Sequence, residues 1–363
     1  MLGAYPKILV SKNILIPDTI VIKRNMPNIS NLFFSKNSMV LNINPFIHAF
    51  RNKNYLNVTN FLLMADIRDW ISISRAKMEV ATIVNPLIGI FMAANNLNDL
   101  LNFSILVYII IYLLIITMAS ELNCLCDLDV DRLYKKNLYF AVLSIGKRKI
   151  KIVVFSKIFL SLLLMTYLLY KGFIVTCLLA LFGLLISIAY SAPPRLKAKG
   201  VGFLFLSIGI FVLPVIGGWF LLKDYFSINL SIFLIGYLLL NGGFILINIG
   251  EDYEEDLKEN IRTIAHIIGL NNLPKVAFLS SFFGYLLLLY SILSMPYNLS
   301  YLFIFIFSLS VAISLYDLYI IMKVKNIKKY AYKVPFWFAI TRYPLLLIFF
   351  IRFFNSHTIM HLL

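Results

Sequence analysis

The fold is decided by one stretch of sequence, residues 103–132, which reads FSILVYIIIYLLIITMASELNCLCDLDVDR. Its first part, 103–122, is an apolar run of the length that a helix needs to cross a hydrocarbon core of about 30 Å. Acidic residues follow at once, so the same helix is predicted to carry carboxylates to the membrane boundary. The stretch therefore predicts a transmembrane helix that ends in a polar site.

Apolar runs of similar length recur along the chain and predict an all-α, polytopic membrane bundle of about nine transmembrane helices. Backbone groups in lipid must pair within their own segment, which favours helices. The runs are continuous rather than alternating, which argues against a β-barrel. We expect the spans at roughly 78–96, 103–122, 152–171, 172–190, 201–222, 228–250, 274–294, 298–322 and 334–352.

The composition agrees with a membrane protein. Of 363 residues, 61% are apolar and 14% are charged, whereas soluble domains have roughly 45–50% and about 25%. A soluble fold of this length could not bury so much apolar surface. These figures exclude a disordered chain, a coiled coil and a soluble nucleic-acid binder. We expect no nucleic-acid partner, despite a net charge of +16.

The basic residues are concentrated in the long connections that follow the second, fourth, sixth and eighth predicted spans. The opposite connections and the C-terminal tail offer only Lys171, Lys223 and Arg352. By the positive-inside rule, the N-terminus and the four basic connections face the cytoplasm, or its equivalent in an organelle. Most of the positive charge is therefore a signal of orientation in the lipid bilayer.

The first 63 residues differ from the rest, because they are basic, contain a single acid (Asp18) and show no clear period. We treat 1–63 as an N-terminal extension of unknown role and 64–363 as the transmembrane domain. The extension could be a transit segment, a disordered tail, or sequence before a natural start at Met64. The sequence leaves these three readings open.

Two acidic islands hold more than half of the 17 Asp and Glu residues. In the first, Asn123, Asp127 and Asp131 are four residues apart and share one helix face. In the second, Asp252 and Asp256 repeat this spacing. One acidic helix end is most simply structural, but two with matched spacing on the same side favour an oxygen-rich site for Mg²⁺ and a substrate phosphate.

A third segment, residues 190–200, lies between the islands and reads YSAPPRLKAKG. Its two prolines end the fourth span, because proline cannot continue a helix. Arg195 and Lys197 follow directly and could bind phosphate through charge and hydrogen bonds. The alternative, that they only anchor the topology, is evenly balanced with this one.

These features together resemble the UbiA superfamily of intramembrane prenyltransferases, over roughly residues 70–352. That family has nine helices, the motifs N-x-x-x-D-x-x-x-D and D-x-x-x-D, and a Y-S-x-P-P segment, which here begins at Tyr190. The chain departs from the family pattern at four places. The Pro-Pro-Arg stretch is one residue shorter than in some relatives, and Asn260 stands where family tails often have Gly. The other two departures lie beside the acidic motifs. Cys124 stands where many relatives have Asp, and Glu251 stands where many have Arg.

The resemblance implies Mg²⁺-dependent transfer of a prenyl group from a polyprenyl diphosphate to a lipophilic acceptor. The acceptor could be an aromatic acid or quinone precursor, a tetrapyrrole or a glycerol phosphate. The residues that the resemblance assigns to the metal are Asn123, Asp127, Asp131, Asp252 and Asp256. It assigns Arg75 and Lys197 to the diphosphate, and Tyr190 and Ser191 to the neighbourhood of the prenyl C1. Arg195 remains a candidate for substrate binding because of its charge and its place after the two prolines.

Two other functions stay open at this stage. A UbiA-type terpene cyclase would use the same metal site but would capture the cation intramolecularly. A transporter or assembly factor is the third reading, although transporters more often place ionisable residues at mid-membrane. Asp317 and Arg342 lie within predicted spans, where charges are costly. We expect Asp317 to pair with Lys323 or to reach the interface, and it could instead pair with Arg342.

Overall fold

The computed structural model describes residues 67–258, 261–295 and 301–355, and the expectation for residues 1–63 lies outside them. Within the described part, eight helices are long and apolar enough to cross a membrane, or nine if one bent pair counts as a single span. The predicted all-α membrane bundle is thus confirmed. The eight helices are α6 (Phe103–Cys126), α9 (Lys147–Tyr170), α10 (Ile174–Ser191), the run Gly202–Trp219, α13 (Ile228–Glu251), α16 (Leu273–Leu293), α17 (Tyr301–Val324) and α19 (Val334–Asn355).

The first predicted span is the bent pair, in which Ile67–Ile73 meets Met78–Ala93 at 51°. Arg75, with φ of 51°, lies at the bend. The second part consists of α4 (Ala76–Thr82) and α5 (Val84–Ala93). Pro86 explains the break between them, because its ring displaces the carbonyl four residues earlier. That carbonyl, on Thr82, instead accepts a hydrogen bond from the Tyr112 hydroxyl.

The fifth span is also irregular. It is divided into α11 (Gly202–Ser207), the π-helical turn η3 (Ile208–Val212) and α12 (Leu213–Trp219). Asn85 of α5 donates a 2.7 Å hydrogen bond to the carbonyl of Ile210 within this turn. Single π-helical turns of this kind are frequent at functional sites.

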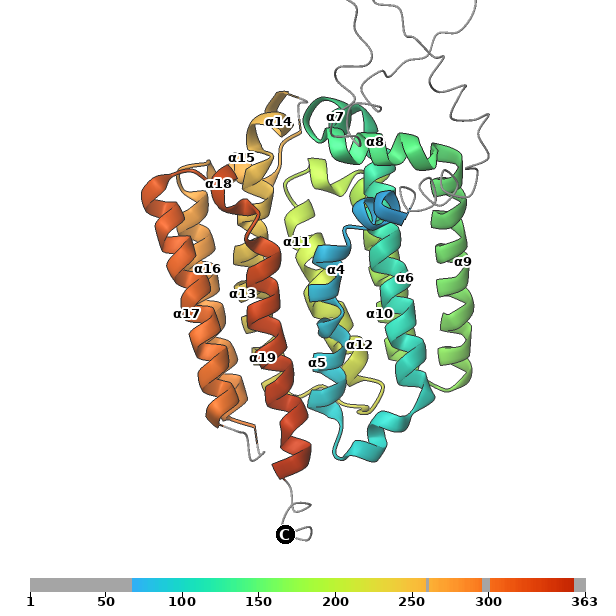
Figure 1. The fold of residues 1–363 in the computed structure, drawn as a ribbon. Coiled ribbons are helices and arrows are strands. Elements are labelled where there is room, and N and C mark those ends of the chain that lie inside the picture. The colour runs from blue at the N-terminus through green and yellow to red at the C-terminus, as the bar shows by residue number, and fades with distance from the viewer. Residues whose placement is uncertain (1–66, 259–260, 296–300, 356–363) are drawn as a thin grey trace, which may run out of the picture. The chain divides into compact units, whose positions relative to one another are not determined.

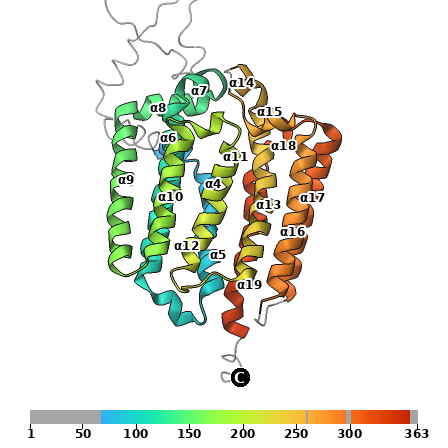
Figure 2. The ribbon, with the colours of Figure 1, turned by 180° about the vertical axis from the view of Figure 1, so that it is seen from behind.

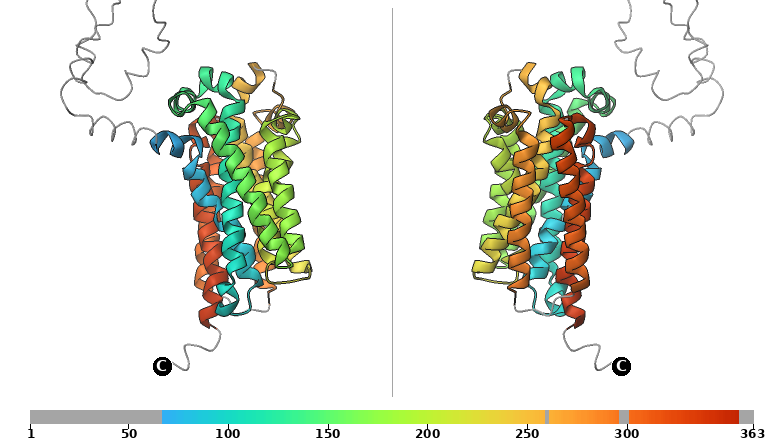
Figure 3. Two further views of the ribbon diagram at one scale, coloured as in Figure 1. Left: turned by 90° about the vertical axis from the view of Figure 1, so that its right-hand side faces the viewer. Right: turned by 90° about the vertical axis from the view of Figure 1, so that its left-hand side faces the viewer.

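The polar connections gather at one end of the bundle, at the top of Figure 1. They carry α7 (Leu128–Tyr134), α8 (Lys136–Ile145), η2 (Leu196–Ala198), α14 (Tyr253–Lys258), α15 (Ile264–Ile268) and α18 (Lys328–Ala331). The view from behind and the two side views show the same arrangement (Figures 2 and 3). The predicted alternation of basic and non-basic connections is therefore confirmed for the described residues.

Two buried apolar clusters fill the bundle. One combines side chains of α5, α12, α13, α16, α17 and α19, and the other combines those of α6, α8, α9 and α10. Within the first cluster, α13 and α16 approach closely, because a Cβ atom on Gly243 would lie 2.1 Å from the Ser281 hydroxyl. Small residues that allow such contact are typical of membrane helix pairs.

Candidate active site

A cavity of about 240 Å³ lies between α4, α6, α10, α13 and the broken fifth span. Its lining is polar toward the end that carries the connections. Deeper in the bundle the lining is mainly apolar, with Ile111, Ile115 and Leu213 among the side chains. The cavity can therefore take a molecule with a charged head and an apolar tail.

The first acidic motif lies where α6 gives way to α7. Asp127 occupies the junction with φ −100° and ψ 11°, so the helix is interrupted there rather than continuous. The backbone bonds from Asp127 to Asn123 and from Asp131 to Asp127 still span four residues. All three side chains therefore line the cavity as the spacing predicts, whereas Asp129 is exposed.

The second acidic motif has the same local geometry. Asp252 separates α13 from α14 with φ −89° and ψ 8°, and the Asp256 amide donates to its carbonyl at 2.8 Å. Both carboxylates line the cavity opposite the first motif. In each motif the first aspartate thus lies at the point where a membrane-spanning helix ends.

The segment after α10 brings two cations to the first motif. Lys197 Nζ donates to the Asn123 amide oxygen at 3.1 Å and also to the Asp127 carboxylate. Arg195 Nη2 lies 3.0 Å from the other Asp127 oxygen. Burial lowers the pKa of Lys197, although the nearby Asp127 charge opposes this. Both predicted cations therefore reach the motif, although only Lys197 lines the cavity.

The remaining predicted substrate residues also lie at the polar end of the cavity. Ser191 is buried and donates to the Asn123 amide oxygen at 3.1 Å. Tyr190 lines the cavity next to it, and Arg75 lines it from the bend before α4. The structure thus brings nine of the ten predicted residues into one cavity, with Arg195 at its edge.

Negative charge accumulates between the two motifs. Burial raises the pKa of Asp131 to about 6, and the charge of Asp127 adds to the rise. Burial and the neighbouring Asp252 raise the pKa of Asp256 to about 7. Lys135 Nζ offsets part of this charge, at 2.7 Å from Asp252 Oδ2. The site would accept further positive charge.

The donor set suits a hard divalent cation. Four carboxylates and one amide line the cavity, and Mg²⁺ prefers such oxygen ligands together with substrate phosphates. Among residues 67–258, 261–295 and 301–355, no three His, Cys, Asp or Glu side chains lie close enough together to hold a metal ion by themselves. Lysine and arginine nitrogens contact Asp127 and Asp252 instead. An open site shared with a phosphate-bearing substrate fits this arrangement.

Three findings go beyond the sequence reasoning or correct it. Lys135 and Glu79 line the cavity but were not predicted. Lys135 continues the four-residue spacing of the first motif, and an acid inside a span, such as Glu79, is a general signal of function.

The partners expected for Asp317 were wrong, because Asp317 contacts Lys333. Arg342 donates to Asn241 and to the carbonyl of Ala81; local sequence does not encode such distant contacts.

Comparison with known proteins agrees with this description. The UbiA prenyltransferase family model matches residues 83–341. Among solved structures, a UbiA homolog from Archaeoglobus fulgidus bound to GPP and Mg²⁺ has a TM-score of 0.56 and 17% identity, over 78% of this chain and 99% of that one. A structure from work on digeranylgeranylglyceryl phosphate synthase has a TM-score of 0.55 and 16% identity, over 80% and 99%. A search of curated proteins finds no match.

The family match covers most of the chain, which therefore belongs to the UbiA prenyltransferase family. The solved structures support the fold, and the family identifies the chain as a prenyltransferase.

Proposed function

We propose that this protein transfers a prenyl group from a polyprenyl diphosphate to a lipophilic acceptor inside the membrane, with Mg²⁺ as cofactor. The observation that carries the proposal is one cavity in which two acidic motifs and three cationic side chains meet at one end and apolar side chains line the other. The solved relative bound to GPP and Mg²⁺ supports the same pairing of substrate and metal. By the positive-inside rule, the polar end faces the cytoplasm or its equivalent.

Each group in the cavity has a role in this reaction. The metal ligands would be Asn123, Asp127, Asp131, Asp252 and Asp256. Bound Mg²⁺ supplies positive charge against the diphosphate. Arg75, Lys135 and Lys197 add fixed positive charge at the same end, which stabilises the leaving group as its charge develops. Arg195 holds Asp127 in place from the edge of the cavity.

The bond changes follow from this arrangement. The C1–O bond to the diphosphate breaks with its electron pair on the leaving oxygen, and the acceptor forms a new bond to C1. Tyr190 and Ser191 line the cavity at the boundary between its polar and apolar parts, where C1 would lie. The surrounding helices exclude water, which would otherwise capture the allylic cation.

The test uses purified protein in nanodiscs with Mg²⁺ and labelled geranylgeranyl diphosphate, with and without a panel of acceptors. The panel contains 4-hydroxybenzoate, a chlorophyllide and a glycerol phosphate lipid. We expect diphosphate release that depends on an acceptor and yields a prenylated product. A cyclic hydrocarbon or alcohol formed without acceptor would instead identify a cyclase. Absence of diphosphate release under all conditions, with Asp127→Ala indistinguishable from wild type, would contradict an enzymatic role.

A further inference from the structure

A second layer of polar side chains lies one helical turn deeper in the cavity than the predicted metal and diphosphate residues. Four membrane-spanning helices that lead to the upper layer each supply one residue to this lower layer. Three or four residues along a helix correspond to about 5 Å. We call the lower layer the lower polar ring, and its members are Glu79 in α4, Ser120 in α6, Ser187 in α10 and Asn248 in α13.

The lower polar ring is centred on a carboxylate that accepts hydrogen bonds. Glu79 Oε1 accepts from the Ser120 hydroxyl at 2.8 Å, and Oε2 accepts from the Thr82 hydroxyl at 3.1 Å. A carboxylate has about four lone-pair positions, so Glu79 can accept further hydrogen bonds from a molecule in the cavity. The tyrosine hydroxyls beneath it are already engaged, since Tyr108 and Tyr112 donate to backbone carbonyls.

Two arginines lie near Glu79 without pairing with it. Arg75 lies one turn earlier on the same helical segment, and the Arg342 guanidinium donates to the carbonyl of Ala81, two residues after Glu79. Within the described residues, neither arginine forms an ion pair with Glu79. The Glu79 carboxylate is therefore not engaged by an ion pair and is left available to a ligand.

The depth of the lower polar ring indicates what it would contact. If the diphosphate occupies the upper layer, then C1 of the prenyl chain lies just below it, between Tyr190 and Ser191 above and this ring beneath. We propose that the lower polar ring is the acceptor subsite, and that Glu79 binds the hydroxyl group of an alcohol or phenol next to C1. This proposal rests on the proposed function. It selects a hydroxyl at this point, because a hydroxyl can donate a hydrogen bond to Glu79 as Ser120 and Thr82 do.

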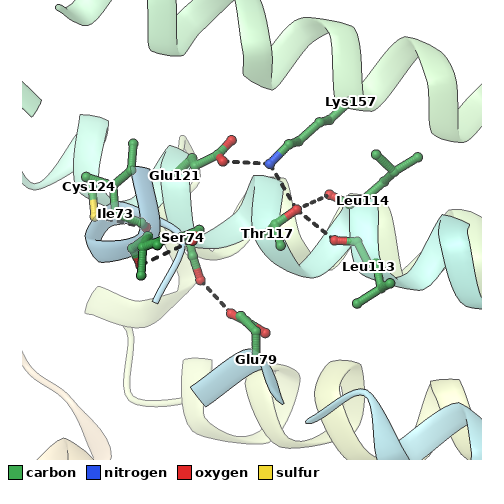
Figure 4. Close-up of polar contacts among 11 residues, drawn as sticks. Ile73, Ser74, Glu79, Leu113, Leu114, Thr117, Glu121, Cys124 and Lys157 are labelled. Carbon is green, nitrogen blue, oxygen red and sulfur yellow. Dashed lines mark hydrogen bonds and ion pairs between the residues drawn. The ribbon is translucent and has the colours of Figure 1, made fainter. Parts of the chain in front are cut away.

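A matched carboxylate provides the control. Glu121 follows Ser120 in α6 and is buried, but it points away from the cavity and forms an ion pair with Lys157 at 2.6 Å. Figure 4 shows Glu79 and the Glu121–Lys157 pair on opposite sides of α6. Glu79→Gln and Glu121→Gln therefore change one carboxylate each, inside and outside the cavity.

The test measures binding of tritiated 4-hexylphenol and its methyl ether, 4-hexylanisole, to the full chain in nanodiscs, with empty nanodiscs subtracted. Mg²⁺ and unreactive geranyl thiolodiphosphate fill the upper layer. We expect the phenol to bind about tenfold more tightly than the ether in the wild type and in Glu121→Gln, because only the phenol can donate a hydrogen bond to the Glu79 carboxylate. In Glu79→Gln the ratio should fall below about threefold.

Binding of the thiolodiphosphate separates the two proposals. If the wild type does not bind it, the proposed function fails. If the wild type binds it but does not distinguish phenol from ether, only the acceptor subsite is refuted, and this outcome requires no variant to fold. Retention of the wild-type ratio by a Glu79→Gln protein that still binds the thiolodiphosphate would equally overturn the assignment to Glu79.

Discussion

Lys135 Nζ lies 2.7 Å from Asp252 Oδ2, so a lysine from the connection after the first acidic motif pairs with the first aspartate of the second motif. This contact joins residues 117 positions apart in the sequence. Burial acts to lower the pKa of Lys135, but the charge of Asp252 and its hydrogen bond outweigh burial and raise it. The lysine therefore remains a cation beside the predicted diphosphate position.

Replacement of Lys135 should affect substrate binding more than stability. The pair is about one-third exposed on each side, so Lys135→Met should change the free energy of unfolding by less than about 1 kcal/mol. Loss of a charged contact should raise KM for the prenyl diphosphate about tenfold. Lys136→Met, at an exposed neighbouring position, is the control, and equal effects in both variants would contradict a specific role for Lys135.

Replacing an aspartate that lines the cavity should lower activity far more than replacing a nearby aspartate that is exposed. Asp127→Asn removes a predicted metal ligand and should lower kcat/KM about 100-fold or more, because a bound metal stabilises the leaving group by several kcal/mol. Asp129→Asn changes an exposed acid two residues away and should keep activity within about twofold. Steady-state kinetics with saturating Mg²⁺ checks both, and equal losses would show that general charge rather than position matters.

Mg²⁺ affinity should fall as the pH is lowered through neutrality. The pKa of Asp256 is raised to about 7 and that of Asp131 to about 6, and a carboxyl must lose its proton to bind a metal. At about pH 6 only about one tenth of Asp256 is ionised, so affinity should be about tenfold weaker than at pH 8. Calorimetry in two buffers should also detect released protons, and Asp256→Asn should flatten the profile.

The orientation of the bundle can be tested with a native cysteine. Cys126 is exposed at the end of α6 that carries the predicted site, whereas Cys124 and Cys177 are buried. A membrane-impermeant maleimide should label Cys126 in inverted vesicles but not in intact cells, if the protein resides in the plasma membrane of its expression host. Cys126→Ser should abolish the signal, and labelling in intact cells alone would reverse the proposed orientation.

Local periodicity explains how much of the site could be predicted from the sequence. Residues four apart share a helix face, so Asn123, Asp127 and Asp131 could be placed together without knowledge of the fold. The same spacing does not reveal the interruptions at Asp127 and Asp252. The backbone hydrogen bonds across them still span four residues, so the side chains keep the spacing of a continuous helix. Apolar run length likewise predicted the number of spans but missed the bend at Arg75.

Contacts between distant segments could not be predicted in the same way. The Lys135–Asp252 pair depends on how α7 and α14 pack above the bundle, and no local pattern encodes that packing. The same holds for Arg342, whose expected partner Asp317 lies against Lys333 instead. Glu79 was detectable as an isolated acid inside a span, but only the cavity reveals what surrounds it.

The matched interruptions at Asp127 and Asp252 have a consequence for how activity arises during biosynthesis. Each half of the chain contributes one long helix, one junctional aspartate and one short helix, and the halves are joined through residues 220–227 at the far end of the bundle. When only the first half of the chain has been translated, only one of the two acidic motifs is present. Catalysis must therefore wait until the second half has inserted and packed, so a partly assembled bundle is kept from consuming prenyl diphosphate.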